Sequence, residues 1–498
     1  MAAALIPFQP SLRPSLPTIE GNVDYRQLRD GLLRIDQILI DSGLEKKFVA
    51  DSLEQWLAQS EFPQKVRASS QVNYQVHSRR ALRCNILRTY LQEDYRGFAA
   101  RLADSPLFQH FCLVDEIDRV KVPAKSTLQR YAHWTDEKTL RDLIDQALRQ
   151  AHHHPEKLGL EQSVDLDACF LDTTCLKANI HYPVDWVLLR DATRTLMKGV
   201  DLIRGQGLCH RMEEPALFRK RMNQLCIQIT HSSKKIDNKK HRKKVLRKMD
   251  KLIGTVANHA KRYRRILDEQ WEKTQWTRPQ VEQVLRRLYN VLEQLPAARA
   301  QARQRIIQEE PVANQDKILS LYEDAIRVVV RHKAGAEVEF GNTLLLGESR
   351  QGLIMHWVLF EESAPADARL VKCSVESIQE SLQIKIKELG ADRGFDSASM
   401  QEWLAEEKTY NGICPRDPHQ LKERMNSWKF VKLQRRRSQT EGRISIIIHN
   451  FLGSPIRSKG FAHRQLSVGW GVLTHNLWVL ARLPKRQVQK KAARRKAA

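Results

Sequence analysis

Three acidic residues, far apart along the chain, stand where their carboxylates could share a metal ion. Asp172 ends an alternating polar and apolar segment typical of a strand, Asp392 ends a later strand-like segment, and Glu441 begins a helical segment. We expect the two strand ends to be neighbours in one sheet and the helix to bring Glu441 over them. Carboxylate oxygens suit Mg²⁺, and two such ions roughly 4 Å apart can hold the attacking and leaving oxygens of a phosphoryl displacement. The pattern predicts a catalytic and metal-binding site at these three acids, for two Mg²⁺ that Mn²⁺ could replace.

Each of the three acids also has an ordinary structural interpretation, which the sequence leaves open. Asp172 could be a turn residue, and Asp392 could cap the turn that follows it. Glu441 fits a capping box with Ser438, in the pattern S-x-x-E. Their joint placement, rather than any one acid, favours the metal site.

Other acids compete for these roles. Asp165 and Asp167 lie close to Asp172, but alternation along a strand places them on its other face, and only Asp172 is followed by two threonines. Three further acids are expected to be structural: Asp185, Asp191 and Asp396.

The charge balance of the chain points to a polyanionic partner. The sequence has 498 residues, with 83 Lys and Arg against 58 Asp and Glu, for a formal net charge of +25. Basic residues gather at 234–251, at 429–437 and in the C-terminal tail from residue 482. Such clusters are typical of phosphate binding, so we predict double-stranded DNA as the partner. The predicted DNA-binding residues are Arg437, Arg443, Lys240, Lys244, Arg247 and Lys251.

Hydrophobic periodicity divides the chain into parts. The predicted order is a loose segment 1–22, a helical domain 23–155, a first core segment 160–185, a helical basic insertion 186–330, the rest of the core 335–483, and a basic tail 484–498. In the helical domain, a short helix after Ser105-Pro106 and a second one near Thr127, which Ser126 would cap, could form a helix-turn-helix joined by a tight turn; an ordinary helical bundle is the alternative. In the insertion, apolar residues spaced four and three apart form a coiled-coil-like seam at Val245, Met249, Leu252, Val256, His259, Tyr263 and Ile266.

These parts predict an α/β protein. Without the insertion, the order is a strand, a hairpin around Arg350-Gln351-Gly352, and then helices alternating with two short strands, which matches an RNase H-like mixed sheet. No run of 18 apolar residues suggests a membrane span, and the N-terminus lacks the features of a signal peptide. The eight cysteines include no C-x-x-C pair, so we expect a reduced, cytoplasmic protein without a zinc site.

At the three acids, the sequence resembles the DDE-type transposases of bacterial insertion sequences. Asp172-Thr173-Thr174 resembles the first block of that family, Asp392-Arg393-Gly394-Phe395 the second, and the segment from Arg437 to Ile444, R-x-x-x-E-G-R-I, the third. The resemblance covers about residues 100–483. It implies an RNase H-like catalytic core that binds the terminal inverted repeats of its element, cleaves DNA with Mg²⁺ and joins the freed 3′ end to target DNA. It also implies an enzyme associated with the nucleoid and at least a homodimer in the active complex.

The sequence departs from the family around the last acid. Some relatives have the signature Y-x2-R-x3-E-x6-K, whereas this chain has Gln434 in place of the Tyr and Ile448 in place of the Lys. The DNA contacts of those two residues are therefore not carried over. Two other functions remain open: a metal-dependent DNA nuclease or resolvase on the same fold, and a non-catalytic DNA-binding descendant.

Overall fold

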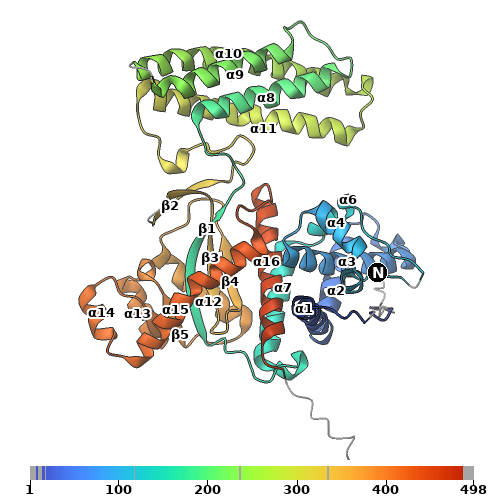
Figure 1. Cartoon of the computed structure of the whole chain (residues 1–498), viewed down its shortest axis with the longest axis vertical. Helices are drawn as coiled ribbons and strands as arrows, with labels where there is room; N and C mark the ends of the chain where they lie inside the picture. The colour runs from blue at the N-terminus through green and yellow to red at the C-terminus, as the bar shows by residue number, and fades with distance from the viewer. Residues whose placement is uncertain are drawn as a thin grey trace, which may run out of the picture. The chain divides into compact units, whose positions relative to one another are not determined.

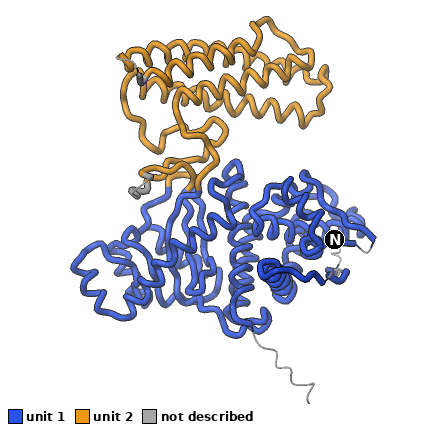
Figure 2. The backbone as a smooth tube through the Cα atoms, in the orientation of Figure 1, with its two compact units in different colours: residues 1–176, 343–360, 364–498 blue, residues 177–342, 361–363 orange. Residues whose placement is uncertain are grey.

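The computed structural model divides the chain into two compact units (Figures 1 and 2). Unit 1 comprises residues 1–176, 343–360 and 364–498, and unit 2 comprises residues 177–342 and 361–363. The structure describes residues 7–8, 14–16, 18–116, 118–234, 237–333 and 336–485. Most of the predicted N-terminal segment 1–22 and nearly all of the basic tail 484–498 therefore lie outside the described residues.

The first part of unit 1 is helical, as predicted. Local capping explains where several of these helices begin, because an Asn, Asp or Ser side chain accepts a hydrogen bond from a free N–H of the first turn. Asn22 accepts from the Tyr25 N–H and Asp136 from the Thr139 N–H, both at 2.9 Å. The helices are α1 (Val23–Asp41), α2 (Leu44–Ala58), α3 (Ala68–Leu91), α4 (Tyr95–Asp104), α5 (Pro106–Cys112), α6 (Lys125–Ala132) and α7 (Glu137–His153).

The tight turn predicted between α5 and α6 is wrong. Both short helices form, and Ser105 caps α5 as Ser-Pro suggests. However, residues 113–124 connect them, whereas a helix-turn-helix has a turn of three or four residues. Helix α6 also begins at Lys125 with Ala124 at its cap position, so Ser126 is not the cap.

A mixed sheet forms the second part of unit 1. Strand β1 (Ala168–Lys177) lies between β3 (Ala336–Glu348) and β5 (Glu388–Ala391), and β6 (Tyr410–Ile413) borders β5. Strands β1, β5 and β6 are parallel, whereas β4 (Ile354–Leu359) pairs with β3 in the predicted antiparallel hairpin. The helices of this part are α12 (Asp367–Leu382), α13 (Ala398–Glu406), α14 (Pro418–Arg424), α15 (Trp428–Ile447) and α16 (Phe461–Arg482).

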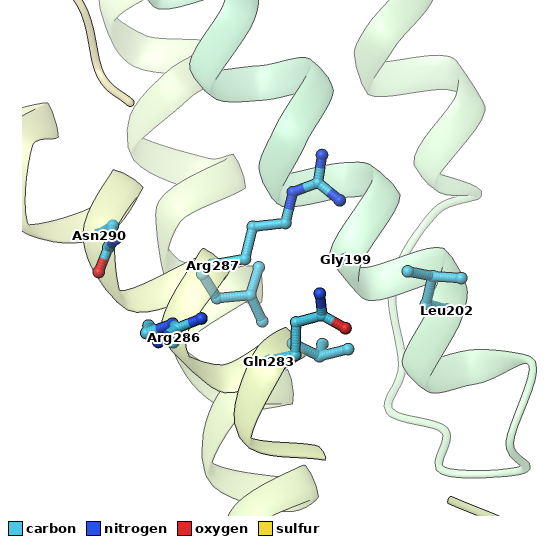
Figure 3. A pocket seen from close by; sticks show the side chains of 8 residues that line it. Gly199, Leu202, Gln283, Arg286, Arg287 and Asn290 are labelled. Carbon is cyan, nitrogen blue, oxygen red and sulfur yellow. The ribbon is translucent and has the colours of Figure 1, made fainter. Parts of the chain in front are cut away.

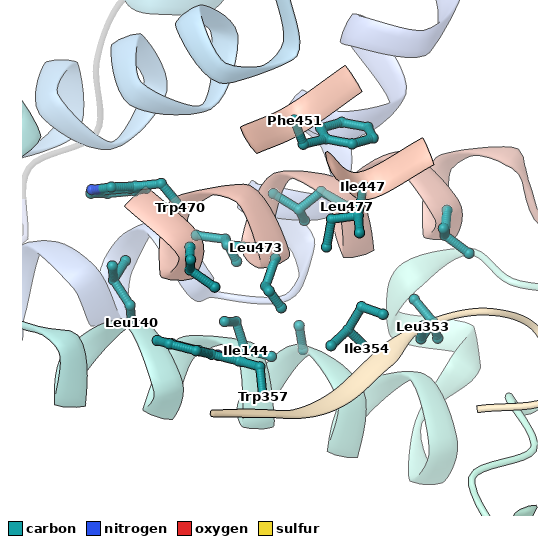
Figure 4. Close-up of a cluster of buried hydrophobic side chains, with 14 of the residues drawn as sticks. Leu140, Ile144, Leu353, Ile354, Trp357, Ile447, Phe451, Trp470, Leu473 and Leu477 are labelled. Carbon is teal, nitrogen blue, oxygen red and sulfur yellow. The ribbon is translucent and has the colours of Figure 1, made fainter. Parts of the chain in front are cut away.

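Helix α16 joins the N-terminal helices and the sheet into one hydrophobic core. It packs against α7 and β4, and Figure 4 shows side chains of all three elements meeting there. Leu473 of α16, Ile144 of α7 and Trp357 of β4 are all buried in this core. The predicted helical domain 23–155 is therefore not a separate unit, because it shares its core with the sheet.

Asn476 fixes α16 to the hairpin. Its side-chain amide donates to the Ile354 carbonyl and its oxygen accepts from the Ile354 N–H, both at 2.8 Å, so that the side chain acts as a strand partner of β4. Its neighbour His475 is also buried, and burial lowers the pKa of His475 to about 4. Asn476 and its buried neighbour His475 thus have a structural role in this chain.

Unit 2 contains a helical bundle with its own core. Its helices have apolar stripes that face one another, and residues such as Leu196, Met249 and Leu288 are buried there. The helices are α8 (Asp185–Arg204), α9 (Pro215–Thr230), α10 (Asn238–Gln270) and α11 (Arg278–Arg303). The predicted seam of α10 is buried or half-buried inside this bundle, so packing within one chain accounts for it.

Unit 2 also contains a strand that the sequence analysis missed. Residues Arg327–Lys333 form β2, which pairs antiparallel with the first part of β3. This segment was assigned to the end of the helical insertion. Its valine run, Val328 to Val330, favours a strand because β-branched side chains lose little freedom in extended backbone.

Among the described residues, no helix combines the length and the apolar character needed to cross a bilayer.

Candidate active site

The parallel pairing of β1 and β5 brings Asp172 and Asp392 together. The last paired residues are Phe170 and Gly390, and each acid lies two residues further along its strand direction. Parallel strands present their carboxyl ends at the same edge, so the two acids stand side by side. The prediction that Asp172 ends its strand is wrong: β1 continues to Lys177 because the long strand β3 borders its other side. Asp172 instead follows the segment that pairs with β5.

The backbone after Asp392 enters a short helix, which begins beside two carboxylates. The Asp392 carboxylate accepts from the Gly394 N–H at 2.8 Å and so caps the short helix Arg393–Phe395. A Cβ on Gly394 would lie 3.0 Å from an Asp392 carboxylate oxygen and 2.8 Å from one of Asp367. Asp392 therefore has the capping role that its structural interpretation suggested, and a side chain at position 394 would have to displace the Asp367 carboxylate.

Asp367 is an acid of this site that the sequence analysis missed. It lies in the first turn of α12, and its carboxylate accepts from the Thr173 hydroxyl at 3.3 Å. Thr173 also donates its backbone N–H to Asp172 at 2.8 Å, so it links the two carboxylates. An acid in a first helical turn is common for electrostatic reasons, and nothing near Asp367 in the sequence marked it as different.

Helix α15 carries the third acid across the sheet. The helix begins at Trp428, capped by Ser427, rather than near Ser438 as predicted. It packs on β5 and β6, and the Gln434 amide donates to the Gly412 carbonyl at 2.6 Å. Glu441 therefore lies within the helix, and the capping-box interpretation is wrong: the Ser438 hydroxyl donates to the Arg435 carbonyl.

Arg437 lies between the two strand acids. One of its terminal nitrogens is 3.8 Å from an Asp172 carboxylate oxygen and 3.5 Å from one of Asp392. Its side chain is only 19% exposed, and its Nε is buried without a hydrogen-bond partner. The sequence predicts that Arg437 binds DNA, and in the structure its guanidinium faces these two acids.

Burial and neighbouring charges both act on the Asp172 carboxyl group. Burial raises the pKa of Asp172 to about 6, Arg437 opposes this shift, and the negative charges of Asp392 and Glu441 add to it. Both acids are therefore close enough to Asp172 to disfavour its ionisation. Keeping these carboxylates charged and close together costs free energy, and a bound cation would reduce that cost.

This cost predicts that Asp172→Asn stabilises the protein. Asp172 has a higher pKa when folded than when unfolded, so its favourable contribution is complete below about pH 4 and is lost as the pH rises through about 6. At pH 7, Asp172→Asn should increase the free energy of unfolding of unit 1 by about 1–3 kcal/mol. Urea unfolding at pH 7 and pH 4.5 measures this, with the gain shrinking at the lower pH. A variant that is less stable than the parent at pH 7 would contradict it.

A buried ion pair holds α15 against the hairpin. Arg436 is 2.7 Å from Glu348 at the end of β3, and the Thr440 hydroxyl donates to the same carboxylate oxygen at 2.8 Å. The Arg436 guanidinium also donates to the Ser349 and Arg350 carbonyls, both at 2.9 Å. These contacts fix the register of α15, and with it the positions of Arg437 and Glu441.

The competing acids have partners of their own. Asp165 and Asp167 precede β1, which begins at Ala168, so the prediction that they lie on the other face of that strand is wrong. Asp165 pairs with Arg350 at 2.8 Å, and Asp167 pairs with Lys387 at 2.6 Å. Asp396 accepts from the Arg416 N–H at 2.9 Å. In unit 2, Asp185 pairs with Arg305 at 3.0 Å and Asp191 with Arg190 at 3.1 Å.

The predicted DNA-binding residues differ in their surroundings. Arg443 is half-buried and donates to the Gln351 carbonyl at 2.7 Å, which ties it to the hairpin turn. Four basic residues of α10 are exposed on one face of the helix: Lys240, Lys244, Arg247 and Lys251.

Arginines also line a cavity in the bundle of unit 2. Arg286 and Arg287 of α11 lie at a hollow of about 390 Å³ that Gly199 and Leu202 of α8 border on the other side (Figure 3). Both arginines are exposed, so they add to the positive charge of this unit.

The donor chemistry of the candidate site fits Mg²⁺, since carboxylate oxygens are the ligands it prefers. In the described part of the chain, however, no three His, Cys, Asp or Glu side chains lie close enough together to hold a metal ion as they stand. Comparisons of this chain with protein-family models, with curated proteins and with solved structures found no match.

Proposed function

We propose that the protein is a transposase that cleaves and joins DNA with Mg²⁺. The observation that carries the proposal is the pairing of β1 and β5, which sets Asp172 beside Asp392 under the helix that bears Glu441. The strand arrangement supports it, because a hairpin on one side of β1 and two parallel strands on the other match the order of an RNase H-like core. The net charge of +25 supports a nucleic-acid partner.

In this proposal, Asp172, Asp392 and Glu441 hold the metal ions. When bound, the ions would supply an activated water and stabilise the charge that develops on the phosphate. The chain itself orients its acids: Thr173 and Gly394 donate backbone N–H groups to Asp172 and Asp392, and the Arg436–Glu348 pair fixes the helix of Glu441. No covalent protein–DNA intermediate is needed.

The proposal is tested by incubating the protein with DNA carrying the sequences that flank its own gene, together with a target plasmid and Mg²⁺. We expect strand cleavage at the ends and joined products in the plasmid. Nicks without joined products would instead indicate a nuclease or resolvase. Absence of metal-dependent cleavage, with DNA binding retained, would favour a non-catalytic DNA-binding protein.

Holding two DNA ends in one complex calls for at least two protomers, so we also propose a homodimer in the active complex, associated with the nucleoid in the cytoplasm. The seam of α10 is an unsuitable dimer contact because Val245, Met249 and Val256 are already buried inside the bundle. The dimer contact is expected elsewhere. Analytical ultracentrifugation with and without end DNA measures the oligomeric state.

The exposed face of α10 is proposed to bind the DNA backbone. Lys240 and Lys244 are exposed there. Lys239 is exposed as well, but it and Lys243 pair with Glu309, at 2.9 and 2.8 Å. Replacing Lys240 and Lys244 with glutamine should weaken duplex binding and reduce the slope of log K against log salt by about 2. The matched control replaces Lys239 and Lys243 and should change the slope less. Fluorescence anisotropy over a series of KCl concentrations measures both, and equal effects would contradict the assignment.

A further inference from the structure

The Arg437 guanidinium lies where a metal ion shared by Asp172 and Asp392 would lie. A single terminal nitrogen faces both strand acids, at 3.8 Å from Asp172 and 3.5 Å from Asp392. Both distances exceed those of a tight charge-assisted hydrogen bond, about 2.7–2.9 Å. The guanidinium therefore neutralises the pair of carboxylates without forming the close fork that would fix it there.

A metal ion and this guanidinium compete for the same carboxylate oxygens. Mg²⁺ needs its ligands at roughly 2.0–2.1 Å, which leaves no room for Arg437 between Asp172 and Asp392. The competition agrees with the finding that no three acidic or other metal-ligating side chains among the described residues are gathered closely enough for an ion. Arg437 must move before metal can bind to both acids.

The position of Arg437 on α15 offers a route for that movement. The guanidinium is partly exposed, and the helix itself is held independently by Arg436, Gln434 and Thr440, which contact the hairpin and the sheet. The side chain can thus swing without displacing the helix. A DNA phosphate at the site would offer an anionic partner with which arginine pairs strongly.

We propose that Arg437 is the resting counter-ion of the acids and that DNA binding exchanges it for metal. A DNA phosphate takes up Arg437, and Asp172 and Asp392 then become available to the metal ion. DNA and metal should therefore bind with positive coupling, each raising the affinity for the other. This inference rests on the proposed function, because it assumes that these acids bind metal and that the chain binds DNA.

Binding of Mn²⁺ to the full-length protein, followed by the EPR signal of free Mn²⁺, tests the exchange. Without DNA, Arg437→Gln should bind Mn²⁺ at least about tenfold more tightly than the parent, within the usual range of coupling energies. Arg435→Gln removes the same charge from an exposed position of the same helix and should leave the affinity unchanged. Adding a short duplex should increase the affinity of the parent but not that of Arg437→Gln, after subtraction of Mn²⁺ bound to the duplex alone.

Two further variants separate the possible failures. Arg437→Lys retains the charge and should bind Mn²⁺ like the parent, so tighter binding by Arg437→Lys would overturn the role of the charge even if thermal melting shows that Arg437→Gln does not fold. If Asp392→Asn binds Mn²⁺ as well as the parent, the metal site itself is wrong and the proposed function fails. If Asp392→Asn loses Mn²⁺ but Arg437→Gln gains nothing over the parent, the metal site stands and the role of Arg437 is overturned.

Discussion

Asp392→Asn is expected to reduce metal-dependent DNA cleavage by about a thousandfold or more, since metal ions supply much of the catalysis in such sites. Asparagine retains the shape of the side chain and an oxygen that can accept from the Gly394 N–H, so the turn after β5 should survive. What it loses is the negative charge that a metal ion requires. Single-turnover cleavage of end DNA measures the effect.

The matched control for this prediction is Asp167→Asn. Asp167 also lies beside β1 and β5, but it precedes β1, where its partner is Lys387. We expect this variant to cleave within a few-fold of the parent rate. Cleavage by Asp392→Asn at the parent rate would show that the carboxylate has no part in the chemistry.

Glu348→Gln should destabilise unit 1 by about 3–5 kcal/mol, because it leaves the Arg436 guanidinium buried without its counter-ion. The Arg436 side chain is 10% exposed and that of Glu348 is 2% exposed, so solvent replaces little of the lost interaction. Urea unfolding, followed by a probe placed in unit 1, measures the change.

Two further variants serve as controls for Glu348→Gln. Glu376→Gln breaks an exposed pair with Lys372 on α12 and should change stability by less than about 1 kcal/mol. Combining Glu348→Gln with Arg436→Met removes both charges and should recover much of the loss, because apolar groups often replace a buried pair at little cost. An unchanged midpoint for Glu348→Gln alone would mean that the pair does not hold α15 in place.

The sequence predicted the parts of unit 1 that depend on local patterns. The hairpin around Arg350-Gln351-Gly352 was predicted correctly, because two strand-like segments that flank a short turn are a local pattern. Asp172 and Asp392 were predicted because each ends a strand-like segment of the sequence; in the structure Asp172 lies within β1, and the parallel register of β1 and β5 brings the two acids together.

The features that were missed depend on packing between distant segments. Helix α15 begins at Trp428 rather than Ser438, because its first turns gain their stability from packing on β5 and β6. Asp367 joins the site only through the fold, since Thr173 and Gly394 approach it from other parts of the chain. The tight turn after α5 was predicted wrongly as well, because local patterns do not fix the residue at which a short helix ends or begins.

The most direct test of the central claim is the location of Mn²⁺ by anomalous scattering in crystals of the full chain bound to end DNA. The account predicts Mn²⁺ coordinated by carboxylate oxygens of Asp172 and Asp392, with Glu441 completing the site and Arg437 withdrawn from both strand acids. Mn²⁺ bound elsewhere in a cleavage-competent complex, with Arg437 still between Asp172 and Asp392, would contradict it.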